Sequence, residues 1–333
     1  MMGLRSPGIM ASVLLALLPG MMTATWVFGP GVLLNVLTAT AVAWLTEAVC
    51  LRLRGQPVMA RLSDHSALLT GWLLALALPP ASPIWLVAAG VAAAVGFGKH
   101  LYGGLGQNPL NPAMLGYALL LVSAPVSMTT LWLEPWAALG ASDALAAWFG
   151  QAPDARTGAT ILNLYRHEFA ALTAPEIQNH PMLSESSLGV AAGTEWVALA
   201  YALGGLWLLR QRIMTWHAPL GFLIGLLLPA AFFAVDADAS TPFSAHLLGG
   251  AALFAAFFIV TDPVSGATSP KGRLWFGLGV GVLTYIIRMA GQYPEGVAFA
   301  VLLMNFAVPL IDHYTRPRIL GRAASVKGSG GIQ

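Results

Sequence analysis

Long apolar runs, separated by short polar or proline-containing segments, make up most of this chain. About 20 apolar residues are enough for a helix to cross a bilayer, and fewer suffice where helices are broken. The pattern therefore predicts ten membrane helices, two of them short and ending at Pro79-Pro80 and Asp262-Pro263. Their expected ranges are 7–28, 31–50, 66–78, 83–97, 113–122, 196–209, 219–235, 245–260, 274–287 and 296–311.

Residues 123–194 form the only long polar segment within the apolar pattern. The predicted organisation is thus a first membrane half (residues 1–122), a loop region between helices five and six (123–194), a second membrane half (195–318) and a tail (319–333). The expected fold class is an all-α polytopic membrane protein.

Composition supports this class. The 333 residues are 57% hydrophobic and 9% charged, whereas about a quarter of the residues in soluble proteins are charged. Cys50 is the sole cysteine, so the chain can neither close an internal disulfide nor hold an iron–sulfur cluster on its own thiolates. If the protein carries electrons, an organic cofactor must carry them, and we expect no metal site.

Charge predicts the orientation. With both termini in the cytoplasm, all 16 Lys and Arg except Arg156, Arg166 and Arg288 lie on the cytoplasmic side. Most acidic residues then lie outside. Positive residues stay inside during insertion, so we expect a multi-pass membrane protein whose 123–194 loop lies outside the cytoplasm.

A weak internal repeat is also visible. Ser66–Gly71 and Ser244–Gly249 each open a short segment, and each segment is followed by a helix, a Gly/Pro-rich stretch and a further apolar run. Five crossings per half would make the halves inverted repeats with broken helices, the architecture of many transporters. Together with the Asn-Pro-Ala sequence at 111–113, this keeps a small-solute transporter or channel as the alternative function.

Chemistry concentrates in the external loop. The sequence Asp154-Ala155-Arg156-Thr157-Gly158-Ala159-Thr160 is similar to the acceptor sequence of bacterial flavin transferases, which join the phosphate of FMN to a threonine oxygen. Nearly the same pattern recurs at Asp262–Thr268. The predicted topology puts Thr160 outside, where these transferases act, and Thr268 in a cytoplasmic turn. We therefore expect attachment at Thr160, with Asp154, Thr157, Gly158 and Ala159 as the recognition motif.

Several further stretches identify a family. The sequences at 102–109, 111–114, 261–264, 293–303 and 309–318 resemble the RnfD family, the D subunits of Rnf electron-transport complexes. The B subunit of the sodium-pumping NADH:quinone oxidoreductase is similar to a lesser degree. Ile161-Leu162 departs from the Pro-Leu that often follows the acceptor threonine in this family, and leaves the attachment core intact.

The resemblance implies a location and a function. The location is the bacterial inner membrane, with residues 123–194 in the periplasm. Such a subunit would carry covalent FMN as one relay between ferredoxin and NAD, coupled to transport of Na⁺ or H⁺. Its implied partners are Rnf subunits A, B, C, E and G, a periplasmic flavin transferase and the lipid bilayer, with no nucleic acid. The relative also implies a second, non-covalent flavin (riboflavin). No complete active site is expected in this chain alone.

Buried polar positions are the remaining candidates. Asn111 is suited to cap a helix that begins at Pro112, and Asn108, Asn111 and Asp262 are expected to line a cofactor or ion site near the membrane midplane. Glu47 lies five residues before Arg52 and would form an ion pair at the interface or handle protons or cations. Arg156 or Arg166 would screen the phosphodiester at Thr160.

Overall fold

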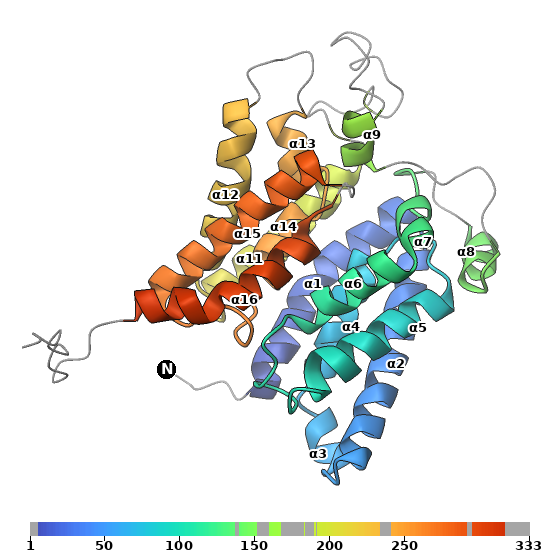
Figure 1. Ribbon diagram of the computed structural model, residues 1–333. Coiled ribbons are helices and arrows are strands. Elements are labelled where there is room, and N and C mark those ends of the chain that lie inside the picture. The colour runs from blue at the N-terminus through green and yellow to red at the C-terminus, as the bar shows by residue number, and fades with distance from the viewer. Residues whose placement is uncertain are drawn as a thin grey trace, which may run out of the picture.

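The computed structural model describes residues 6–136, 140–151, 160–167, 192–233, 241–291 and 295–316, with the single positions 183 and 190. Within these residues every extended regular element is a helix (Figure 1). In this part of the chain four helices are long and apolar enough to cross a membrane: α1 (Ser6–Phe28), α2 (Gly31–Leu53), α15 (Pro270–Ala290) and α16 (Val297–Thr315). Shorter apolar helices complete a multi-pass membrane fold.

The remaining helices belong to the two predicted halves and to the segment between them. The first half adds α3 (Val58–Leu62), α4 (Ser66–Ala77), α5 (Ile84–Ala93) with the π-helix η1 (Ala94–His100), and α6 (Pro112–Ser123). Short helices follow: α7 (Pro125–Thr130), α8 (Ala141–Trp148) and α9 (Ile161–His167). The second half adds α11 (Thr194–Arg210), α12 (His217–Phe233), α13 (Phe243–Leu248), α14 (Ala252–Phe254) and the π-helix η3 (Ala255–Ile259).

Two groups of helices pack against each other along a seam. In the first half α2 contacts α4 and α5, and in the second half α12 runs along α15. Figure 1 shows the blue-green helices of the first half beside the orange and red helices of the second. Across the seam α1 packs along α11, and α6 contacts α16. One continuous hydrophobic core joins the halves.

The eighth apolar segment differs from its predicted form. The sequence predicts one helix over 245–260, but the structure contains α13, a turn at residues 249–251, and then α14 continuing into η3. We call residues 249–251 the inter-helix turn. The break comes within the apolar run and not at the Asp262-Pro263 pair, and it positions the site described below.

Glycines set the distance between α12 and α15 along the Gly277–Thr284 stretch of α15. A Cβ atom on Gly277 would collide with the Ala218 carbonyl, and one on Gly281 with the Phe222 carbonyl. Gly279 instead faces the end of the Met304 side chain. The stretch is therefore a helix-packing surface, in which small residues allow close approach of two backbones.

This difference separates two alanine substitutions. We expect Gly281→Ala to lower the free energy of unfolding by about 2 kcal/mol, because a backbone carbonyl cannot move away. In Gly279→Ala the flexible Met304 side chain can rotate, and we expect a loss below about 1 kcal/mol. Thermal unfolding of the two variants in the same detergent measures the contrast, and equal melting temperatures would contradict it.

Candidate functional site

Thr160 lies directly before the short helix α9. Its carbonyl accepts hydrogen bonds from the amides of Asn163 (2.8 Å) and Leu164 (3.0 Å), so Thr160 occupies the position where the helix begins. The residue is half-buried and lines a cavity between the two halves. The helix that follows therefore fixes the backbone of Thr160.

The start of α9 is anchored on the inter-helix turn. Ile161 and Leu162 are 2% and 7% exposed. The Ile161 methyl group Cγ2 lies where a Cβ on Gly249 would project, and Leu162 Cδ1 lies where a Cβ on Gly250 would project. The two glycines therefore make the surface on which α9 rests. Ile161-Leu162, the departure from the family pattern, supplies the apolar contact.

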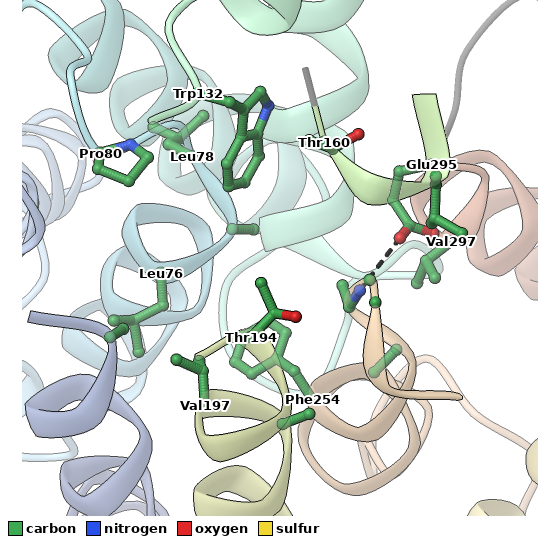
Figure 2. Close-up of a pocket in the computed structure, with 18 of the residues that line it drawn as sticks. Leu76, Leu78, Pro80, Trp132, Thr160, Thr194, Val197, Phe254, Glu295 and Val297 are labelled. Carbon is green, nitrogen blue, oxygen red and sulfur yellow. Dashed lines mark hydrogen bonds between the residues drawn. The ribbon is translucent and has the colours of Figure 1, made fainter. Parts of the chain in front are cut away.

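The cavity has a volume of about 200 Å³ and draws its walls from both halves. Phe28 of α1, Tyr117 of α6, Tyr201 of α11 and Phe254 of α14 are among its aromatic lining residues, with Trp132 from the connecting segment. Figure 2 shows Thr160 and Glu295 on one side of the cavity, with Trp132 and Leu78 across from them. The walls are mostly apolar, and polar groups gather where Thr160 lies.

Glu295 and Arg288 form an ion pair at this wall. Arg288 Nη2 lies 3.0 Å from Glu295 Oε1 and 2.9 Å from Oε2, and Nη1 donates to the His246 carbonyl at 2.7 Å. Glu295 Oε2 also accepts a hydrogen bond from the Ala251 amide at 3.1 Å, the dashed line in Figure 2. The pair thus connects the loop before α16, the end of α15 and the inter-helix turn.

Most of the predicted recognition motif lies outside the described residues. This applies to Asp154, Thr157, Gly158 and Ala159, and to Arg156. Arg166 belongs to α9, but its side chain is also outside the described part of the protein. Of the motif, the structure places only Thr160. Burial raises the pKa of the nearby Tyr165 phenol to about 12, so this residue of α9 stays neutral at physiological pH.

The second motif has a different environment. The Thr268 hydroxyl donates to Asp312 Oδ2 at 3.0 Å, and the Thr268 amide donates to Asp312 Oδ1 at 3.0 Å. Asp262, the first residue of this motif, accepts hydrogen bonds from the Ser265 hydroxyl (2.6 Å) and the Val264 amide (3.1 Å). Burial raises the pKa of the Asp262 carboxyl. This motif is a structured turn whose threonine is held by a carboxylate.

Asn108 and Asn111 lie at the start of α6. Asn111 caps the helix as predicted, since its side chain accepts the Met114 amide at 3.1 Å and Pro112 is the first helical residue. The Asn111 amide donates to Asn305 Oδ1 at 2.9 Å, and Asn305 Nδ2 donates to the Ser265 carbonyl at 2.9 Å. Asn108 donates to the Leu110 carbonyl at 3.0 Å. Asn108, Asn111 and Asp262 are not among the described residues that line the Thr160 cavity.

Glu47 has partners that sequence spacing did not indicate. Lys99 Nζ lies 2.8 Å and 2.9 Å from its two carboxylate oxygens, and His100 Nε2 lies 2.7 Å from Oε2. Lys99 also donates to the Ser66 hydroxyl at 2.8 Å. The π-helical turn of η1 carries both basic residues, and all three side chains are at most 5% exposed. Arg52, the partner expected from sequence, is exposed.

Sequence reasoning did not single out Gly249, Gly250 or Glu295 as parts of the Thr160 site. The only sequence signal for Glu295 was the charge pattern, which predicts Glu295, Arg288 and Thr160 on the same outer side of the membrane. Nothing in the local sequence indicates that the ion pair reaches the inter-helix turn, because the partners are about 40 residues apart.

Comparisons with known proteins agree on one family. A family model described as NQR2, RnfD, RnfE matches residues 3–321. A protein of Pseudomonas aeruginosa, named as the D subunit of the ion-translocating oxidoreductase complex, is 53% identical over 331 residues, covering 97% of this chain and 94% of that protein. A protein of the same name from Marinobacter nauticus is 48% identical over 330 residues, covering 97% of this chain and 93% of that protein. Another from Cellvibrio japonicus is 48% identical over 327 residues, covering 95% of this chain and 91% of that protein.

Proposed function

Because the chain belongs to the NQR2, RnfD, RnfE family, we propose that it is the membrane subunit of a redox-driven ion-translocating complex and carries FMN on Thr160. The observation that supports this most is the position of Thr160 at an apolar cavity shared by the two halves. A phosphoester bond from Thr160 Oγ1 would hold the flavin beside the cavity permanently. Such a tether keeps the cofactor at high effective concentration and removes its dissociation from the cycle.

The residues present fit a flavin in this place. Pockets that enclose a whole small molecule measure about 300–1,000 Å³, so a cavity of about 200 Å³ suits the ring system better than the whole nucleotide. The ribityl chain and phosphate would remain at the Thr160 end. Trp132, Phe254 and Tyr201 offer aromatic surfaces for a planar ring. When bound, the flavin supplies one- and two-electron redox chemistry, and the chain supplies its position.

We propose the finer architecture on the same basis. Ten crossings in two inverted halves would make helices one and six, and helices five and ten, equivalent pairs. In the structure α1 packs along α11, and α6 contacts α16, so each proposed pair meets at the seam. A two-fold axis in the membrane plane brings equivalent helices together in this way.

We further propose partners and location. The subunit assembles with Rnf subunits A, B, C, E and G in the bacterial inner membrane, receives FMN from a periplasmic flavin transferase and couples electron flow to Na⁺ or H⁺ transport. A second flavin, riboflavin, would bind without a covalent bond. Asn108, Asn111 and Asp262 remain candidate lining for a buried site, but their observed hydrogen bonds serve the start of α6 and the turn after η3.

An absorption spectrum of the purified complex tests the function. We expect flavin maxima that survive denaturation and gel filtration, because the cofactor is bound through a phosphoester. The small-solute transporter predicts instead a colourless subunit that passes solute when reconstituted alone. A subunit without flavin, from cells that contain the transferase, would favour that alternative.

Topology gives a separate prediction. A reporter that is active only in the periplasm, fused next to Asp154, should be active, and the same reporter after residue 316 should be inactive. The physical reason is that nearly all Lys and Arg then stay on the cytoplasmic side. Activity of a cytoplasm-specific reporter at Asp154 would reverse the orientation and exclude Thr160 from periplasmic modification.

A further inference from the structure

We infer that the Arg288–Glu295 ion pair is the positioning element of the flavin-attachment site. It holds the inter-helix turn on which α9, the helix that follows Thr160, rests, and its carboxylate balances a buried positive charge beside the cavity. The inference rests on the proposed attachment of FMN to Thr160, and it assigns roles to two residues that lie far from Thr160 in the sequence.

The ion pair holds the inter-helix turn from both sides. Arg288 Nη1 donates to the carbonyl of His246, three residues before Gly249, and Glu295 Oε2 accepts from the amide of Ala251, the residue after Gly250. Glu295 Oε1 also accepts from the Gly296 amide at 3.1 Å, where α16 begins. The carboxylate thus joins the turn to α16, and the guanidinium joins the end of α13, just before the turn, to α15.

The broken helix needs these partners. A helix leaves its last carbonyls and first amides without intrahelical hydrogen bonds, and an apolar environment offers no water to replace them. The His246 carbonyl lies near the end of α13, and the Ala251 amide lies directly before α14. A cation at a helix end and an anion at a helix start also match the direction of the peptide dipoles. The ion pair therefore stabilises the break itself.

Gly250 is where the ion pair and the Thr160 helix meet. A Cβ atom built on this glycine would lie 2.7 Å from Glu295 Oε2, 2.8 Å from Leu162 Cδ1 and 2.9 Å from Arg288 Nη2. The turn can hold α9 and the ion pair together only because residue 250 has no side chain. Displacement of the ion pair therefore displaces the surface beneath Leu162, and Thr160 lies two residues before Leu162.

The charges of the pair are unequally buried. The side chain of Arg288 is 2% exposed, whereas that of Glu295 is 21% exposed and lines the cavity. With both present, the cavity wall carries no net charge from the pair. Removal of the carboxylate charge would leave a buried guanidinium behind the wall of the cavity at its Thr160 end. A positive charge there stabilises the anionic reduced flavin and raises its reduction potential.

Two substitutions separate these roles. Arg288→Lys keeps the charge but cannot donate to His246 and to both Glu295 oxygens in a fixed fork. We expect it to slow covalent attachment by about tenfold, the effect of losing one charge-assisted hydrogen bond, and to leave the potential unchanged. Glu295→Gln keeps an acceptor for Ala251 but loses the charge, so it should slow attachment and also make the potential more positive.

The test uses the assembled complex in cells that contain the flavin transferase. Covalent flavin per mole of subunit is followed by in-gel fluorescence after induction, and the potential by spectroelectrochemical titration, each as the difference from the Thr160→Ala complex. Arg52→Lys is the matched control, the same change at an exposed position, and should attach flavin at the wild-type rate. A wild-type rate in Arg288→Lys, or an unchanged potential in Glu295→Gln, overturns the inference.

A glycine pair covers the case in which the charge variants do not fold. Gly250→Ala adds a methyl group at the meeting point and should slow attachment, whereas Gly96→Ala adds one where no atom lies within 4 Å and should not. Equal rates in the two would also refute the positioning role. If the wild-type complex carries no more covalent flavin than the Thr160→Ala complex, the proposed function fails. If the wild type carries flavin but the Arg288 and Glu295 variants attach it at the same rate, only the positioning role fails.

Discussion

Thr160→Ala should abolish covalent flavin in this subunit while leaving the amount of membrane-inserted protein unchanged. The methyl group that remains cannot form a phosphoester, so the loss is complete and not a matter of degree. Anchoring of α9 should persist, because Ile161 and Leu162 provide its buried contacts. In a denaturing gel the fluorescent band at the mass of the subunit should disappear, and the protein stain should not.

Thr268→Ala is the matched control for this result. Thr268 follows a nearly identical sequence, but its hydroxyl donates to Asp312, and its turn adjoins the basic start of α15, on the side predicted to be cytoplasmic. We expect full fluorescence in Thr268→Ala, and also in the conservative Thr160→Ser, which retains a hydroxyl. If the band instead persists in Thr160→Ala and is lost in Thr268→Ala, the flavin is attached to Thr268. That result would contradict both the site assignment and the predicted topology, in which Thr268 is cytoplasmic.

Lys99→Met should give the largest loss of stability among the substitutions considered. It leaves the carboxylate of Glu47 buried without its main counter-charge, and breaking a buried pair in this way costs about 3–5 kcal/mol. His100 remains hydrogen-bonded to Glu47 Oε2 and can offset part of the loss. We expect a marked decrease in the melting temperature of the detergent-purified protein and in its yield from membranes.

A double substitution separates charge from packing. Glu47→Gln combined with Lys99→Met removes both charges and should recover much of the stability lost in Lys99→Met alone, since no unpaired ion remains. Fluorescence-detected gel filtration of the single and double variants provides the comparison. A double variant as unstable as Lys99→Met would show that shape, and not the uncompensated carboxylate, determines the cost.

Local signals in the sequence predicted much of the fold. The apolar run at 66–78 became α4 (Ser66–Ala77), and Asn111 followed by Pro112 starts α6 as expected, with the side-chain cap in place. These features succeed because each depends on residues within one or two helical turns, where hydrophobic length, capping and side-chain size act directly.

Features that depend on distant partners were not predictable in the same way. The helix break at residues 249–251 occurs within an apolar run of small residues, and its hydrogen bonds come from Arg288 and Glu295. Glu47 likewise finds Lys99 and His100 about 50 residues later, through a π-helical turn that no periodicity signals. The Thr160 motif predicts a chemical modification but says nothing of the cavity, whose walls require both halves.

The order of residues along the chain has a consequence for biogenesis. Thr160 leaves the ribosome well before the glycines, arginine and glutamate that fix its position, and before α16, which completes the cavity wall with Val297 and Ala298. A nascent chain that has inserted only its first half therefore presents the acceptor hydroxyl without its final surroundings. With FMN attached to Thr160 as proposed, loading in the finished geometry has to wait for α16, so we expect a chain whose translation stops early to remain without its flavin.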